Sequence, residues 1–148
     1  MPVTFQSARF GVVEIAERDI IEFPLGLIGL GGSRFTLIDR NRGTGFLWLH
    51  ELDDPALALP VVAPEQFFSN FALQITPEDR ARTGLEDLEG ARVYVTVRAT
   101  PNPAEITANL RAPLVIKDGR GYQVINTKEP APLQAPLFTL HASPPIAS

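Results

Sequence analysis

The fold of this chain is decided by one stretch, Ile106-Thr107-Ala108-Asn109-Leu110-Arg111-Ala112-Pro113-Leu114-Val115-Ile116. It begins with small and polar residues and ends in an apolar run. Pro113 cannot donate to a strand ladder, so we expect it at the start of a strand. The three apolar residues after it are typical of a buried strand. Asn109 favours a bend, because its side chain can bond the nearby backbone. The stretch therefore predicts a bend that leads into a buried strand, and such a bend can also contact a partner.

Short runs of alternating apolar and polar residues predict further strands on both sides of this stretch. The clearest is 91–99, where valines alternate with polar residues, which predicts a sheet with one face in water. The other runs lie at 9–15, 19–23, 34–39, 46–50, 58–63, 71–75 and 121–126. Pro60 suits the edge of a sheet, and Asp118-Gly119-Arg120 suits a hairpin turn. About nine short strands predict an all-β fold, a single compact β-barrel-like domain of short antiparallel strands.

One or two short surface helices are expected beside the strands. Thr76 is a favourable residue for capping the start of a helix, and Gly84 can end it, so a helix is predicted between them. Residues 85–90 could add another turn, and 64–68 suit a single turn that begins at a proline. These helices are too short and too polar to form the core, so we expect them on the surface.

Length and composition predict one globular domain. The chain has 148 residues and no cysteine, which excludes disulfides, thiol catalysis and cysteine-bound metals. We expect the domain to extend over residues 1–138, and prolines predict a flexible C-terminal tail over residues 139–148. The first residues lack a basic region and an apolar run, so no signal peptide is expected. No stretch approaches the roughly 20 apolar residues of a membrane span. The sequence therefore predicts a cytoplasmic protein with no membrane association.

The net charge of −4 is unevenly distributed. Up to Glu89 the chain has 14 acidic and 7 basic residues, and from Gly90 onward it has 3 acidic and 6 basic residues. An acidic surface repels phosphates, so direct binding of nucleic acid is disfavoured. The same surface would attract a basic protein partner. The alternative interpretation is that these charges serve only solubility.

Acidic residues beside His50 raise the question of catalysis. Glu51, Asp53 and Asp54 follow this histidine, and a metal-assisted hydrolase could use His50, Glu51 and Asp53. The spacing of known metal motifs is absent, however, and Asp-Pro favours a turn. The glycine-rich loop 24–33 lacks the lysine of a phosphate-binding loop. We therefore predict no catalytic residue, no metal and no cofactor.

A small-ligand barrel is the other alternative that the residues suggest. Trp48 and the apolar loop 25–30 would then lie at the mouth of the barrel. Side chains usually fill small barrels, which argues against an open ligand cavity.

An ordered series of motifs covers about residues 5–130. Its strongest member is Thr107-Ala108-Asn109-Leu110-x-Ala112-Pro113-Leu114-Val115-Ile116. The others are Phe10-Gly11, Ile21-x-Phe23-Pro24-x-Gly26-Leu27-x-Gly29, Phe46-Leu47-Trp48-Leu49, Asp53-Asp54-Pro55, Pro64-x-x-Phe67-Phe68 and Gln123-Val124-Ile125. In this order, the motifs resemble the flagellar assembly factor FliW family.

The resemblance implies a non-enzymatic protein with a compact β-barrel-like fold. Proteins of this family bind newly made flagellin, and when flagellin is exported they bind CsrA, a basic translational regulator that represses flagellin mRNA. We expect the contact residues at turns and strand entries: Asp53, Asp54, Asn109, Leu110 and Arg111. For Asp54 and Asn109 a purely turn-forming role is the alternative. The alternatives to the whole function are a flagellin chaperone without the regulator and the small-ligand barrel.

Overall fold

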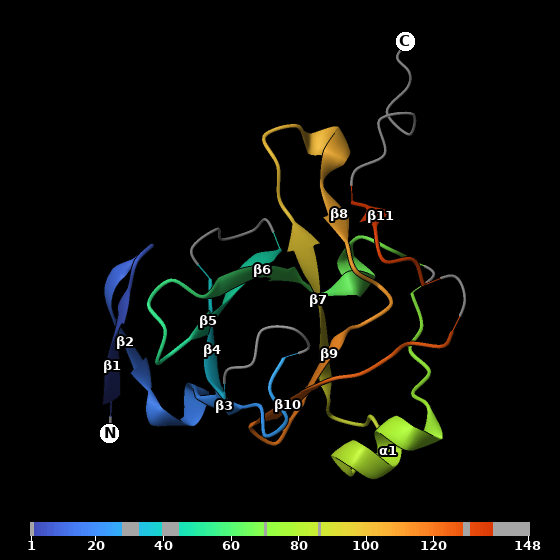
Figure 1. Cartoon of the computed structure of the whole chain (residues 1–148), viewed down its shortest axis with the longest axis horizontal. Coiled ribbons are helices and arrows are strands. Elements are labelled where there is room, and N and C mark those ends of the chain that lie inside the picture. The colour runs from blue at the N-terminus through green and yellow to red at the C-terminus, as the bar shows by residue number, and fades with distance from the viewer. Residues whose placement is uncertain are drawn as a thin grey trace.

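Short strands dominate the computed structural model of the chain (Figure 1). The structure describes residues 2–27, 33–39, 45–69, 71–85, 87–128 and 131–137. The helical segments are α1 (Pro77–Thr83) and the single turns η1 (Glu17–Asp19), η2 (Pro64–Gln66) and η3 (Pro103–Glu105). The strands are β1 (Pro2–Ser7), β2 (Gly11–Ala16), β3 (Ile21–Glu22), β4 (Arg34–Ile38), β5 (Phe46–Glu51), β6 (Ala58–Val62), β7 (Arg92–Arg98), β8 (Thr107–Ala108), β9 (Leu114–Lys117), β10 (Arg120–Gln123) and β11 (Ala135–Pro136).

Seven of these strands pair in a closed ring, in the order β3-β4-β5-β6-β7-β9-β10 and back to β3. Six neighbouring pairs are antiparallel, and β3 and β10 are parallel, with Glu22 opposite Arg120. A ring with an odd number of strands cannot alternate direction throughout, so at least one pair has to be parallel. The all-β, barrel-like fold predicted from the sequence is confirmed, with one parallel pair that the strand patterns did not indicate.

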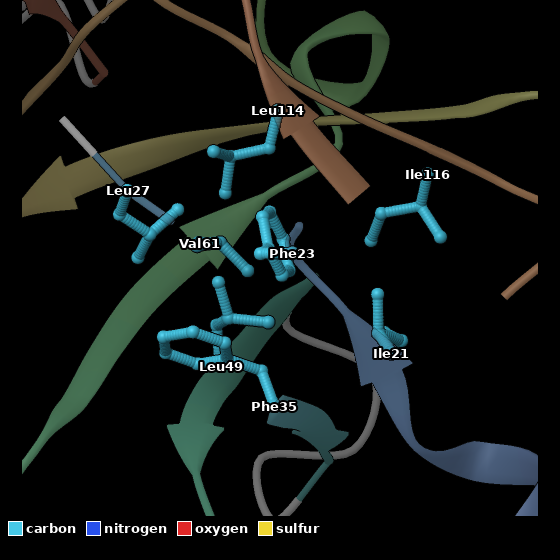
Figure 2. Packing of buried hydrophobic residues seen from close by; sticks show 8 residues of the cluster. All are labelled: Ile21, Phe23, Leu27, Phe35, Leu49, Val61, Leu114 and Ile116. Atoms are coloured by element: carbon cyan, nitrogen blue, oxygen red, sulfur yellow. The ribbon is translucent and has the colours of Figure 1, made fainter. Parts of the chain in front are cut away.

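Apolar side chains fill the inside of the ring. Phe23 and Phe35 meet edge to face, with ring centroids 5.1 Å apart. Burial of one such side chain stabilises a fold by roughly 1.5–3 kcal/mol. Strand β9 begins directly after Pro113 and buries its first three residues, as the opening stretch predicts. The side chains of the core point toward one another in Figure 2: Ile21, Phe23, Leu27, Phe35, Leu49, Val61, Leu114 and Ile116.

Three further apolar clusters lie outside the ring, and the third of them contains Val115 and Val124. The β1–β2 hairpin packs Phe5 and Val13 in one cluster, which Trp48 also contacts. Beside β7, Val95 and Val97 pack together with residues of 108–110 and 131–137. The prediction of a water-exposed face on β7 holds only at its ends, since Tyr94 packs against the barrel core. The covering segments come from elsewhere in the sequence, so the alternation within β7 could not reveal them.

Local signals of helices and turns are confirmed in detail. The Thr76 side chain caps α1 by accepting a hydrogen bond from the Asp79 amide at 3.0 Å, and Gly84 ends the helix at φ 76°. Asp118 and Gly119 have φ angles of 55° and 78° and form a two-residue turn between β9 and β10. Positive φ at both positions is the geometry that favours Asp-Gly in tight hairpins.

The expected strand at 71–75 is wrong. Only Ile75 forms a bridge, opposite Asn126. The Asn126 side chain instead accepts a hydrogen bond from the Gln74 amide at 2.9 Å and donates one to the Ala72 carbonyl at 2.9 Å. A side chain that bonds these backbone groups replaces the strand partner that they would otherwise need.

Two other expectations need correction. The turn of helix expected over 85–90 is not formed at the described residues of that segment. Its first residue, Leu85, is buried against Val115 and Val124, so the chain follows the core there instead of coiling. The last predicted strand, 121–126, is shifted, because β10 ends at Gln123 and the Ile125 amide beyond it donates to the Asp79 carboxylate of α1.

Some expectations lie partly outside the described residues. The tail 139–148 is among them, so the proposed division at residue 138 stays a prediction. Within the glycine-rich loop, Leu27 is buried in the barrel core, as expected for a loop that folds onto it, and Leu25 is exposed. Residues 28–32 of that loop are outside the described residues.

Candidate functional site

The acidic residues after β5 form a compact turn, here called the acidic turn (Glu51, Asp53 and Asp54). The buried Glu51 carboxylate accepts hydrogen bonds from the backbone amides of Arg34 and Asp53, both at 3.1 Å. Asp53 Oδ1 pairs with Arg34 Nη2 at 2.8 Å, and both side chains remain largely exposed. Asp54 Oδ1 accepts from the Ala56 amide at 3.0 Å, so it also shapes the turn, as Asp-Pro predicts.

The raised pKa of Arg34 reflects the negative charge of this surface. A hydrogen bond from Arg34 to Asp53 and the charge of Asp53 raise the pKa of the guanidinium, and Glu51 and Glu22 add to the same direction. Glu22 lies directly opposite Arg34 in the β3–β4 ladder. One arginine therefore sits among several carboxylates, and the surface keeps a net negative charge that suits a basic partner.

His50 is buried, and both of its ring nitrogens have hydrogen-bond partners within the protein. Its ring is fully buried, with Nδ1 2.8 Å from the Glu51 carbonyl oxygen and Nε2 2.8 Å from Ser7 Oγ. A carbonyl oxygen can only accept, so Nδ1 carries a proton and donates to the Glu51 carbonyl, while Nε2 shares a hydrogen bond with the Ser7 hydroxyl. The hydrolase alternative would need His50, Glu51 and Asp53 to share one metal. Instead, the His50 ring bonds Ser7 and the Glu51 carbonyl, the Glu51 carboxylate bonds backbone amides, and Asp53 pairs with the Arg34 guanidinium. Among the described residues, no group of three such side chains could hold a metal ion.

The bend predicted at Asn109 is built by its own side chain. Asn109 Oδ1 accepts hydrogen bonds from the backbone amides of Arg111 at 3.0 Å and Ala112 at 3.1 Å. Leu110 is 5% exposed and packs in the cluster beside β7. Arg111 Nε donates to the Ala131 carbonyl at 2.8 Å. The turn-forming role of Asn109 is therefore present, and a partner contact by these residues stays a prediction.

A cleft lies on each side of this bend. Asn109 lines a cleft of about 350 Å³, here called the β6–β7 cleft, together with Leu27, Leu59, Arg98 and other residues of β7. Leu110 lines a second hollow of about 360 Å³ with Phe67, Phe68 and Phe71. Residues 109 and 110 thus face different surfaces, although they are adjacent in the sequence.

Trp48 does not lie at the mouth of the barrel, as the small-ligand alternative expects. Its ring packs against the β1–β2 hairpin, with the Arg9 guanidinium 4.1 Å from the ring centroid. Leu27 from the apolar loop does line the β6–β7 cleft. That alternative is therefore wrong for the tryptophan, because Trp48 faces the outside of the ring, and its placement of the loop stays a prediction.

The structure does not bring the two predicted groups of contact residues together. The acidic turn joins β5 to β6 beside the β1–β2 hairpin, where the Ala8 amide donates to the Pro55 carbonyl. Residues 109–111 join β8 to β9 at the opposite side of the barrel (Figure 1). The chain thus offers two separate candidate surfaces, one acidic and one beside the two clefts.

Sequence reasoning missed several members of these surfaces. Glu22 and Arg34 belong to the acidic surface because β3 pairs with β4, and Arg98 and Leu133 line the β6–β7 cleft beside Asn109. The excess of acidic residues in the first half of the chain indicated an acidic surface such as the one that includes Glu22. No local signal indicated Arg98 and Leu133, because β7 and the segment 131–137 meet only in the folded chain.

Known proteins are similar to this chain in sequence. Relatives named "Flagellar assembly factor FliW" include that of Leptospira biflexa, 30% identical over 133 residues that cover 87% of each chain. That of Natranaerobius thermophilus is 31% identical over 137 residues, covering 89% of this chain and 90% of its own. That of Bdellovibrio bacteriovorus is 35% identical over 111 residues, and these cover 74% of this chain but only 63% of the relative.

A solved structure and a family model point the same way. A crystal structure of the flagellar assembly factor FliW superposes with a TM-score of 0.81 at 26% identity, covering 93% of this chain and 98% of that one. In the described residues, no helical segment has the length and apolar composition that a membrane span requires. The model of the FliW protein family matches residues 4–137. The chain therefore belongs to the FliW family.

Proposed function

We propose that this protein is a cytoplasmic, non-enzymatic flagellar assembly factor that binds flagellin and, once flagellin has been exported, binds and antagonises the translational regulator CsrA. The observation that carries the proposal is the family match over residues 4–137. Release of CsrA-mediated repression would then link translation of flagellin mRNA to export. Neither direct contact with nucleic acid nor a cofactor is part of this function.

The acidic turn supports the regulator-binding half of the proposal. Asp53 and Asp54 are exposed on one turn, and Glu22 and Glu51 add negative charge around Arg34. A basic, RNA-binding protein would be attracted to this surface, and the same surface would repel an RNA backbone nearby. The contact residues on the acidic side are thus Asp53 and Asp54, held in place by the buried Glu51 carboxylate.

Neutralising the acidic turn is expected to weaken CsrA binding without unfolding the protein. The double variant Asp53→Asn/Asp54→Asn removes two charges, and the new amide at position 54 keeps an oxygen that can accept from the Ala56 amide. We expect roughly fivefold weaker binding, as for the loss of exposed charges at an interface, with a thermal midpoint within about 2 °C of the parent. Calorimetric titration with CsrA at about 50 and 500 mM salt measures both the loss and its screening.

A control variant with the same change in net charge distinguishes the effect of the acidic turn on CsrA binding from the effect of the net charge of the protein. Glu65 and Glu89 are exposed carboxylates outside this turn, and Glu65→Gln/Glu89→Gln should bind CsrA like the parent. Equal binding by the folded Asp53→Asn/Asp54→Asn variant would remove the acidic turn from the interface. Equal losses of CsrA affinity in both double variants would show that only the net charge of the protein matters, and not the position of the acidic turn.

The partners themselves are tested by capture from the cell. We expect the tagged protein, purified from its own cytoplasm, to retain both flagellin and CsrA in mass spectrometry. Capture of flagellin alone would leave a chaperone role and contradict the translational half of the proposal. Capture of neither, from cells that contain both, would contradict the proposed function as a whole.

A further inference from the structure

The β6–β7 cleft begins where the ladder between these strands ends. Only Val61 and Val62 of β6 pair with β7, opposite Thr96 and Val95. The same register, continued by one residue, would place Pro60 opposite Val97. Proline has no amide hydrogen and cannot donate to a partner strand. The ladder therefore cannot continue in full beyond this point.

Two hydrogen bonds show that the Pro60 nitrogen, which carries no hydrogen, faces β7. The Leu57 carbonyl accepts from the Glu51 amide, so on β6 every second residue from position 57 directs its backbone groups toward β5. Pro60 is out of phase with these residues and directs its backbone toward β7. Likewise, the Thr96 carbonyl accepts from the Asn109 amide, so Thr96 faces β8 and Val97 faces β6. The Val97 carbonyl thus points to a strand that cannot donate to it.

The floor and one wall of the cleft are apolar. Leu27, Leu59 and Leu114 line it from the barrel side and belong to the core or pack directly against it. Leu133 lines the cleft from the segment that covers β7, and 64% of this residue is exposed. An exposed leucine beside a leucine-lined hollow offers apolar area that an occupant could bury.

The rim of the cleft offers hydrogen-bond donors. Arg98 is exposed and lines the cleft, and its guanidinium has no ion pair or hydrogen bond within the described ranges. The Asn109 side chain uses Oδ1 to hold the bend, and its amide nitrogen has no hydrogen bond to any described residue. Since both groups can only donate, an occupant with a carboxylate or carbonyl oxygen at this rim would complement them.

We propose that the β6–β7 cleft binds an extended peptide segment of a partner protein, with an apolar side chain on the leucine floor and, two residues along the peptide, an acidic side chain at Arg98. An extended backbone can donate an N–H to the Val97 carbonyl, whereas a helix already uses its own donors internally. This surface is separate from the acidic turn. The inference goes beyond the proposed partners. Peptide binding at the β6–β7 cleft and the proposed function can each fail without the other.

The test is a titration of the ¹⁵N-labelled full-length chain with two capped hexapeptides, followed by NMR. The probes are Val-Thr-Leu-Thr-Asp-Val and Val-Thr-Leu-Thr-Lys-Val, which differ only in the charge two residues after the leucine. We expect the amides of Thr96, Val97 and Arg98 and the side-chain amide of Asn109 to shift with the acidic peptide. The acidic peptide should bind roughly fivefold more tightly than the basic one.

Three variants sharpen the test. Arg98→Gln should bring the affinities for the two peptides within about twofold of each other, whereas Arg92→Gln, a matched control at the other end of β7, should keep the difference. Pro60→Ala restores an N–H opposite Val97 and should let the strands close. The new amide is then expected to be protected from hydrogen exchange, and the peptide-induced shifts at the cleft should be lost.

Several outcomes would overturn the inference. These are the absence of shifts at about 5 mM peptide, shifts that lie outside the cleft, and equal affinity of the parent for both peptides. Undiminished binding by a folded Pro60→Ala variant whose new amide is protected would also contradict it. Binding seen only after truncation behind Leu137 would assign the cleft to the chain's own C-terminal segment instead.

Discussion

Gly121→Ala is expected to lower the free energy of unfolding by about 2–3 kcal/mol, the cost of overpacking a filled core. A Cβ at position 121 would lie 2.7 Å from both Cε1 and Cε2 of Phe23, and it would overlap Cζ as well. Phe23 is 1% exposed and packs edge to face on Phe35, so its ring cannot move away cheaply. Chemical denaturation followed by Trp48 fluorescence measures the loss.

Two further variants show that the cause is this contact. Gly119→Ala, two residues earlier, meets nothing within 4 Å and has only the strain of its positive φ, about 1 kcal/mol. Phe23→Leu shortens the side chain that faces Gly121, so Phe23→Leu/Gly121→Ala should cost at least about 1 kcal/mol less than the sum of the single changes. Additive costs, or a Gly121→Ala variant as stable as the parent, would contradict the packing of Phe23 on this glycine.

Asn126→Leu is expected to have the other large effect, a loss of about 3 kcal/mol or more. Asn126 is 1% exposed and makes four side-chain hydrogen bonds. Its oxygen accepts from the amides of Gln74 and Lys128, and its nitrogen donates to the carbonyls of Ala72 and Leu110. Leucine has a similar volume and no polar atom, so these backbone groups would lose their partner inside the protein.

Asn102 provides the matched control. It is exposed, and its side chain accepts one hydrogen bond from the Ala104 amide, so Asn102→Leu should cost no more than about 1 kcal/mol. Amide hydrogen exchange at Gln74 and Lys128 should accelerate in Asn126→Leu and stay unchanged in the control. Unaltered exchange at these amides would show that Asn126 does not hold the segment as described.

Asn126 also holds the backbone of residues 110 and 111, which belong to the candidate surface beside the two clefts. Its nitrogen bonds the Leu110 carbonyl at 3.3 Å, and its backbone amide bonds the Arg111 carbonyl at 2.7 Å. The bend between the two clefts thus rests on a residue that contacts neither cleft. Binding experiments on this surface therefore have to use substitutions that leave Asn126 in place.

Much of the fold could be predicted because the signals are local. Pro113 followed by three apolar residues marks the start of a buried strand, and Thr76 and Gly84 mark the ends of α1. The Asp118-Gly119 turn needs two positive φ angles, which these residue types accept. Each prediction depends on neighbours within a few positions, so a sequence pattern is sufficient.

The candidate surfaces were predicted less completely, because they depend on pairs of distant residues. Asp54 and Asn109 were recognised as turn formers, and both use their side chains in that way. Leu110 was expected at a contact surface, yet it is mostly buried, because the 131–137 segment packs beside it. The position of Glu22 opposite Arg34 in the β3–β4 ladder could not be predicted, since strand register is set by pairing in the folded sheet.

The sequence by itself indicated the seven strands of the ring but not β1 or β11, and it also indicated the ends of α1, the Asp118-Gly119 turn and the resemblance to the FliW family. Only the tertiary structure decided that seven strands close into a ring with one parallel pair, and that Pro60 faces β7. It also decided that the acidic turn and the Asn109 bend lie apart. The physical reason is that backbone propensity acts over a few residues, whereas ring closure and strand register minimise the free energy of the whole chain.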